Sequence, residues 1–136
     1  MLHNLINSPL KLKTSATYTH LKINNKKFKV IIDSGAESTL MNYKTAKLLD
    51  LIIKEPDDNV KYIAANGETL KTMGWSIIEV EMASYKFHQK CIIINNLSTD
   101  VLLGTDTLNN HGMILNYKDK TIGVGNVVLK LMLMTY

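Results

Sequence analysis

One short motif constrains this chain more than any other feature: Asp33-Ser34-Gly35-Ala36 directly follows the apolar run 28–32. The run predicts a buried β-strand, so the motif places a carboxylate in the turn where that strand ends. A buried acid needs a partner or a function, because removing its charged form from water is costly or raises its pKa. The motif occurs once among 136 residues, so hydrolysis by a pair of carboxylates would need two chains.

The length and composition of the chain predict a single domain, residues 1–136. We expect its core at about 15–117, followed by a C-terminal extension, 118–136, whose role the sequence leaves open. With 46% hydrophobic and 21% charged residues, the chain is typical of globular proteins. Its single cysteine, Cys91, lies in an apolar run and is expected to be buried, and its four histidines are too far apart for a zinc site. We therefore expect no metal and no cofactor.

The charge pattern favours a solvated surface over a nucleic-acid site. The net charge is +4, and lysines cluster in two places: Lys11 and Lys13, and Lys26, Lys27 and Lys29. Apart from Phe28, no aromatic residue is interleaved with these lysines, so we do not expect direct nucleic-acid binding. The N-terminus lacks the pattern of a secretory signal, and the apolar tail 127–134 is too short to span a bilayer. We expect an intracellular protein that does not bind membranes.

The periodicity of apolar residues predicts a mainly β domain with one or two short helices. Asn42 is expected to cap a helix that runs to about Leu51, and a second helix is expected at 105–110, where Gly112 stops it. The expected strands are 18–23, 28–32, 75–82, 87–94, 100–104 and 113–117, and a final strand pair is expected at 121–128.

A hairpin is predicted at 60–73, because Asn66-Gly67 favours a type I′ turn with two residues at positive φ. A two-residue loop would place Ile63 opposite Leu70. Neither face of this ribbon is strongly apolar, so we expect it to project from the domain.

The order of these features resembles the retropepsins, the single-lobed aspartic proteases of retroviruses and LTR retrotransposons. The likeness runs from about Tyr18 to Tyr117, and the tract 103–112 is similar to gypsy-type retrotransposons. Residues 33–39 resemble the active-site loop of this family, and residues 60–73 resemble its flap. Leu102-Leu103-Gly104 resembles the family's apolar-apolar-Gly element, and 105–112 resembles the helix that follows it. The resemblance implies a single-lobed acid-protease β-barrel that assembles as a symmetric homodimer.

The resemblance also implies a role for each site residue. Asp33 is the catalytic acid, and Ser34, Gly35 and Ala36 support its loop. The implied substrate-binding residues are Gly35, Glu37, Leu40, Ile63, Asn66, Gly67 and Leu102. Thr105 stands where many retroviral enzymes carry an arginine, so we expect Asp106 to form other bonds there.

The function implied by the resemblance is that of an aspartic endopeptidase. Two Asp33 carboxyls, one from each protomer, would share one proton and activate a water that hydrolyses a peptide bond. The expected substrate is the chain's own retroelement polyprotein, cut in the cytoplasm or within a virus-like particle.

Two other hypotheses stay open. The second hypothesis is a catalytically inactive dimerisation or peptide-binding module. It rests on two departures from the family: Glu37 stands where retroviral enzymes often have Asp, and the flap has a single glycine. A basic nucleic-acid-binding domain is the third hypothesis, and an oligonucleotide-binding assay would test it.

Overall fold

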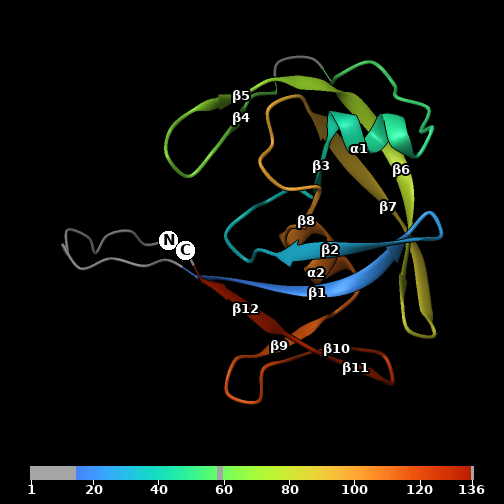
Figure 1. The fold of residues 1–136 in the computed structure, drawn as a ribbon, viewed down its shortest axis with the longest axis vertical. Coiled ribbons are helices and arrows are strands. Elements are labelled where there is room, and N and C mark those ends of the chain that lie inside the picture. The colour runs from blue at the N-terminus through green and yellow to red at the C-terminus, as the bar shows by residue number, and fades with distance from the viewer. Residues whose placement is uncertain (1–14, 58–59, 136) are drawn as a thin grey trace.

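The computed structural model describes residues 15–57 and 60–135. Within these ranges, twelve strands and two short helices confirm the predicted mainly β class (Figure 1). The strands are β1 Ser15–Ile23, β2 Lys26–Ile32, β3 Leu40–Asn42, β4 Tyr62–Ile63, β5 Thr69–Leu70, β6 Thr72–Met82, β7 Tyr85–Ile94, β8 Val101–Leu103, β9 Ile114–Asn116, β10 Thr121–Val124, β11 Val127–Lys130 and β12 Met132–Thr135. The helices are α1 Tyr43–Leu48 and α2 Thr105–Asn110.

Seven strands form the main sheet, in the order β12-β1-β2-β8-β3-β7-β6. The sheet curls until β6 also pairs with β1, so that Ile23 lies opposite Val80. The apolar side chains inside the curl form the core, where Ile23, Val80 and Leu103 have no exposed surface. This burial is the main source of stability, because apolar area removed from water contributes about 25 cal/mol per Å².

The centre of the sheet brings two distant chain segments to one edge. β2 and β8 are parallel neighbours, with Ile31 beside Leu102. On its other side β8 pairs with β3, where Leu40 faces Leu102. The loop 33–39 therefore connects the two strands that flank β8, and it lies where β8 ends.

Cys91 on β7 belongs to the buried core, as predicted. Burial raises the pKa of its thiol, and the Asp106 carboxylate adds to the rise. The thiol therefore stays protonated at physiological pH, and a protonated thiol is a poor nucleophile. Cys91 acts as a small apolar side chain in this fold.

Both predicted helices are present. Asn42 caps α1, since its side-chain oxygen accepts a hydrogen bond from the Lys44 backbone N–H at 2.8 Å. This helix ends at Leu48, earlier than the predicted Leu51. Neither of the six-residue helices in 15–57 and 60–135 could cross a bilayer.

The predicted turn of the 60–73 hairpin is wrong. Of its two central residues only Gly67 has a positive φ, +87°. The Ala64 N–H donates to the Glu68 carbonyl at 2.8 Å, and the Gly67 N–H donates to the Ala64 carbonyl at 2.9 Å. The loop thus has three residues, as in hairpins that end in a left-handed glycine. The Asn66 side chain stabilises it by accepting from the Glu68 N–H at 2.9 Å.

The extra loop residue shifts the register of this hairpin by one position. Ile63 lies opposite Thr69 instead of Leu70, and Tyr62 lies opposite Leu70. The hairpin forms a separate two-stranded sheet, and in Figure 1 it projects from the body of the domain (green, upper left), as predicted.

The segment after Tyr117 packs against the rest of the domain. β10 pairs with β9 and β11, and β12 pairs with β1, where Ala16 lies opposite Met134. Ile122, Val124 and Leu131 contribute to the main core. The lysine cluster at Lys11 and Lys13 lies outside the described residues.

Candidate active site

Asp33 lies at the end of β2, beside β8. Its backbone N–H donates to the Leu103 carbonyl at 2.9 Å, which extends the parallel pairing by one residue. Its half-buried carboxylate accepts through Oδ1 a hydrogen bond from the Gly35 N–H at 2.8 Å. This bond fixes the orientation of the carboxylate, and within the described residues Oδ2 makes no hydrogen bond.

Gly35 allows the loop to pass close to this carboxylate. A Cβ atom added at Gly35 would lie 3.2 Å from Asp33 Oδ1, which is tighter than ordinary packing. Both Ser34 and Gly35 are exposed in the single chain, and Ala36 is half-buried. The loop therefore presents an open surface next to the Asp33 carboxylate.

Backbone hydrogen bonds attach the 33–39 loop to the segment after β8. The Thr105 N–H donates to the Ala36 carbonyl at 2.8 Å, and the Asp106 N–H donates to the Glu37 carbonyl at 3.2 Å. The N–H of Ile92 on β7 donates to the Thr39 carbonyl at 2.9 Å. The loop is thus held along its length by two neighbouring elements.

The Asp106 carboxylate is the centre of a polar network beneath the loop. It accepts hydrogen bonds from the Thr39 N–H at 3.1 Å, the Thr39 hydroxyl at 2.8 Å, the Thr107 N–H at 2.7 Å and the Gln89 amide at 3.3 Å. Completely buried Thr39 also accepts from the Gly104 N–H at 3.2 Å, and its hydroxyl lies 2.6 Å from that of Thr107. Asp106 thus bonds to Thr39, Thr107 and Gln89, as expected for a chain with Thr105 where many retroviral enzymes carry an arginine.

Replacing Asp106 should destabilise the protein markedly. In Asp106→Ala the Thr39 and Thr107 donors would lose their acceptor, and each such loss costs about 1–3 kcal/mol. We expect a lower free energy of unfolding by about 2–4 kcal/mol, measured by denaturant titration followed by circular dichroism. Asp119→Ala is the matched control, because Asp119 bonds only within an exposed turn. Equal denaturation midpoints for the two variants would contradict this role.

A cavity of about 830 Å³ separates the 33–39 loop from the 60–73 hairpin. It is lined by Asp33, Gly35, Ala36, Leu40, Ile63, Ala64, Ala65, Asn66, Glu68, Leu70, Asn96, Leu97, Ser98 and Leu102. Most predicted site residues thus line one space, although they come from three separate chain segments. Ser34, Glu37 and Gly67 do not line it.

A second cavity of about 390 Å³ lies next to the first and shares Gly35, Leu40 and Ile63 with it. Glu37 lines this smaller cavity, opposite Lys61 and Tyr62 from the hairpin. Burial raises the pKa of the Tyr62 hydroxyl, and the Asp57 carboxylate raises it further. Tyr62 is therefore neutral at physiological pH and can donate a hydrogen bond there.

Several lining residues were not predicted from the sequence. Leu70 and Leu97 pack on a small apolar cluster with the buried residues Leu40, Ile92 and Ile94. The polar loop 95–99 carries no local signal for a binding role.

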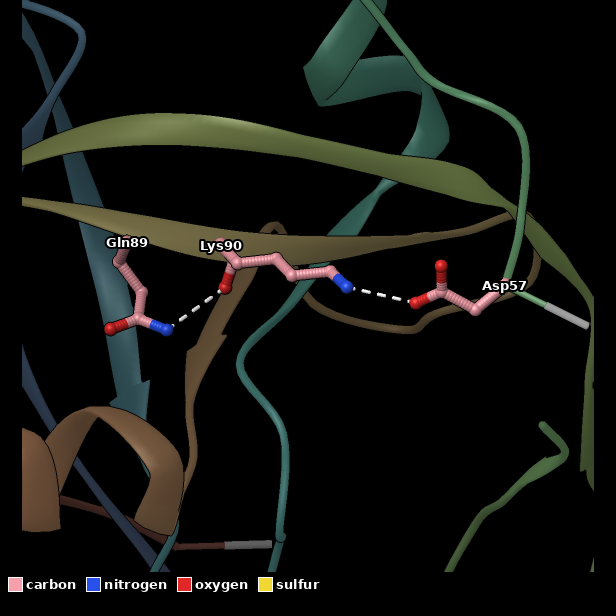
Figure 2. Close-up of polar contacts among 3 residues, drawn as sticks. All are labelled: Asp57, Gln89 and Lys90. Carbon is pink, nitrogen blue, oxygen red and sulfur yellow. Dashed lines mark hydrogen bonds and ion pairs between the residues drawn. The ribbon is translucent and has the colours of Figure 1, made fainter.

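An ion pair attaches the chain before the hairpin to β7. Figure 2 shows the Lys90 side chain reaching Asp57, with Nζ 2.8 Å from Oδ2, while the Gln89 amide donates to the Lys90 carbonyl at 3.0 Å. The Lys90 Nζ also lies 4.6 Å from the centre of the Trp75 ring. Both charged groups are about half exposed, so the pair contributes little stability.

In 15–57 and 60–135, no three His, Cys, Asp or Glu residues gather as a metal site would require.

Residues 19–110 match the model of a protein family described as "gag-polyprotein putative aspartyl protease". The chain is also similar to the protein DDI1 homolog of Leishmania major, with 24% identity over 116 residues. That match covers 85% of this chain and 30% of the relative, so the chain spans less than a third of that protein's length.

Three of the solved structures that share the fold illustrate the likeness. The retroviral protease-like domain of Ddi1 from Leishmania major has a TM-score of 0.72, at 21% identity, and the match covers 88% of this chain and 95% of that one. EIAV protease complexed with the inhibitor HBY-793 has a TM-score of 0.56, at 15% identity, with 79% and 95% covered. A retropepsin-like aspartic protease from Rickettsia conorii has a TM-score of 0.56, at 19% identity, with 93% and 97% covered. At these identities the likeness shows the retropepsin-like fold, as predicted.

Proposed function

This chain belongs to the gag-polyprotein aspartyl protease family, and we propose that it is an aspartic endopeptidase active as a homodimer. One observation carries the proposal: Asp33 lines a cavity of about 830 Å³ between its own loop and the 60–73 hairpin. A cavity of this size is suited to a ligand, and a carboxylate on its wall can exchange protons with what binds there.

The proposed dimer supplies the second acid. Two Asp33 carboxyls close together do not both ionise readily, because like charges repel, so the pair holds one proton. Its pKa values belong to the pair and not to either residue. In the described residues β12 pairs only with β1, so the outer edge of β12 is available for a strand of the second copy.

Hydrolysis then needs only these two groups and a water. The ionised carboxylate takes a proton from the water, whose oxygen attacks the carbonyl carbon of the scissile peptide bond. The protonated carboxyl donates its proton to the carbonyl oxygen, which gives a tetrahedral intermediate. The C–N bond breaks as the carboxyl that took the proton from water gives it to the leaving nitrogen, while the other carboxylate takes back a proton from the hydroxyl of the intermediate. The free amine and carboxylic acid leave, and the pair again holds one proton.

The substrate in this proposal is an extended segment of the element's own polyprotein, cut in the cytoplasm or within a virus-like particle. It would lie between the 33–39 loop and the hairpin and form backbone hydrogen bonds as an added strand does. Gly35 and Glu37 would bind its backbone, and its side chains would contact Leu40, Ile63 and Leu102 on the cavity walls. Asn66 and Gly67 would close over it and exclude water.

The test combines sedimentation with a cleavage assay. A statine-type peptide, which mimics the tetrahedral intermediate, should inhibit cleavage of fluorogenic peptides made from polyprotein junctions. At 100 times its dissociation constant the peptide should tighten the dimer about 100-fold. Binding of the peptide to a monomer with no shift to dimer would contradict the proposal. A dimer that binds the peptide but cleaves no junction would favour the inactive peptide-binding module.

A further inference from the structure

The positive charge of this protein is concentrated on the β1–β2 hairpin. Residues 15–32 contain four lysines and no acid, which equals the net charge of +4 of the whole chain. The remaining residues hold twelve lysines and twelve acids and are neutral together. The hairpin crosses the domain in Figure 1 (blue), with its turn beside the strands β6 and β7.

The strand register gathers these charges on one face. His20 lies opposite Lys29, and Lys22 lies opposite Lys27, so the four side chains share the outward face of the hairpin. All four are exposed, whereas Leu21 and Ile23 on the other face are buried. We call Tyr18, His20, Lys22, Lys27 and Lys29 the basic strip.

Two rings lie beside Lys29 at one end of this strip, and the Lys22–Lys27 pair lies at the other end. Half-buried Tyr18 is diagonal to Lys29, whose Nζ lies 4.4 Å from the ring centre. The exposed His20 ring lies edge to face with Tyr18, with ring centres 5.7 Å apart. Along the sequence the one ring among these lysines is Phe28, which packs against the core, but strand pairing places the His20 and Tyr18 rings beside Lys29 on the outward face. The lack of aromatic residues among the lysines, which argued against nucleic-acid binding, therefore does not hold on this face.

We propose that the basic strip binds single-stranded nucleic acid. Alternate residues of a strand are about 6.6 Å apart, so the strip presents cations and rings in an extended row. Lysines attract backbone phosphates, and rings stack on bases, which is how single strands are bound without sequence preference. The inference is independent of Asp33 and of the cavity, and so goes beyond the proposed protease function.

Two acids of β6 lie at the edge of the strip, Glu79, whose backbone bonds Asn24 in the β1–β2 turn, and Glu81, on the same face of β6. Glu81 on β6 faces Lys22 in the strand register. Its carboxylate is 4.0 Å from Lys86 Nζ, so a second lysine offsets its charge. The strip therefore keeps a net positive charge, and the rings distinguish it from a surface that would attract any acidic peptide.

The test is fluorescence anisotropy of the full chain with a labelled uridine oligonucleotide of about 20 residues. With three or four phosphates contacted, the affinity should fall about 20- to 50-fold between 50 and 200 mM salt. The triple variant Lys22→Gln/Lys27→Gln/Lys29→Gln should lose at least about tenfold in affinity and most of the salt dependence. The control variant Lys44→Gln/Lys118→Gln/Lys120→Gln removes the same charge elsewhere and should change the affinity less than about twofold.

A second variant separates stacking from charge. His20→Ala should weaken binding about fivefold or more while leaving the salt dependence unchanged. Circular dichroism and thermal melting would show that the variants are folded. Equal losses in the two triple variants, no binding by the wild type, or equally tight binding of a polyglutamate peptide would each overturn the proposal.

Discussion

Asp33→Asn is expected to abolish peptide-bond cleavage while leaving the chain folded. An amide cannot take a proton from water, so neither protomer would supply a base, and general acid–base catalysis contributes about 10²–10⁴-fold to a rate. The amide oxygen of the introduced side chain can still accept the hydrogen bond that Gly35 donates to Asp33 Oδ1 at 2.8 Å. The substitution therefore removes the chemistry and keeps the loop geometry.

This expectation is checked with a fluorogenic polyprotein-junction peptide, together with sedimentation and thermal melting. We expect a rate at least about 10³-fold lower, with the dimer and the melting temperature nearly unchanged. Asp119→Asn is the matched control, since it removes an exposed acid from a turn after β9 and should keep full activity. Cleavage by Asp33→Asn at the wild-type rate would show that this acid is not catalytic.

Much of the fold could be predicted because local signals determine it. The Asn42 cap, the short α2 helix and the apolar runs of β6 and β7 each follow from neighbouring residues. The position of Asp33 at the end of a buried strand was also visible, because an apolar run directly precedes it. Such features need no knowledge of distant contacts.

Other features could not be predicted because they depend on which strands pair, and in what register. The 60–73 hairpin has a three-residue loop in which the Asn66 side chain accepts from the Glu68 N–H, and the Asn-Gly signal does not reveal this arrangement. The bonds from Thr39 to Asp106 join residues 67 positions apart. The basic strip likewise exists only because His20 and Lys29 meet across the β1–β2 register.

Gly104→Ala is expected to be strongly destabilising, for a steric reason alone. Gly104 caps α2 with φ −100° and ψ −173°, a backbone conformation that alanine adopts without strain. An added Cβ, however, would lie 2.5 Å from the Ser38 carbonyl oxygen and 2.8 Å from that of Ala36. Both atoms belong to the backbone of the 33–39 loop, which Thr105 and Asp106 hold in place. The loop or α2 must therefore move.

Such overpacking costs about 3 kcal/mol, which in a domain of this size lowers the melting temperature by about 10 °C. Melting should be compared at one protein concentration, because a dimer's stability depends on it. Gly123→Ala is the control, since its Cβ would lie 3.6 Å from the nearest atom, an ordinary contact. We expect that variant to melt near the wild type, and Gly104→Ala also to lose cleavage activity as the displaced loop carries Asp33 out of position. If both glycine variants melted alike, the close contact between Gly104 and the 33–39 loop would not limit stability.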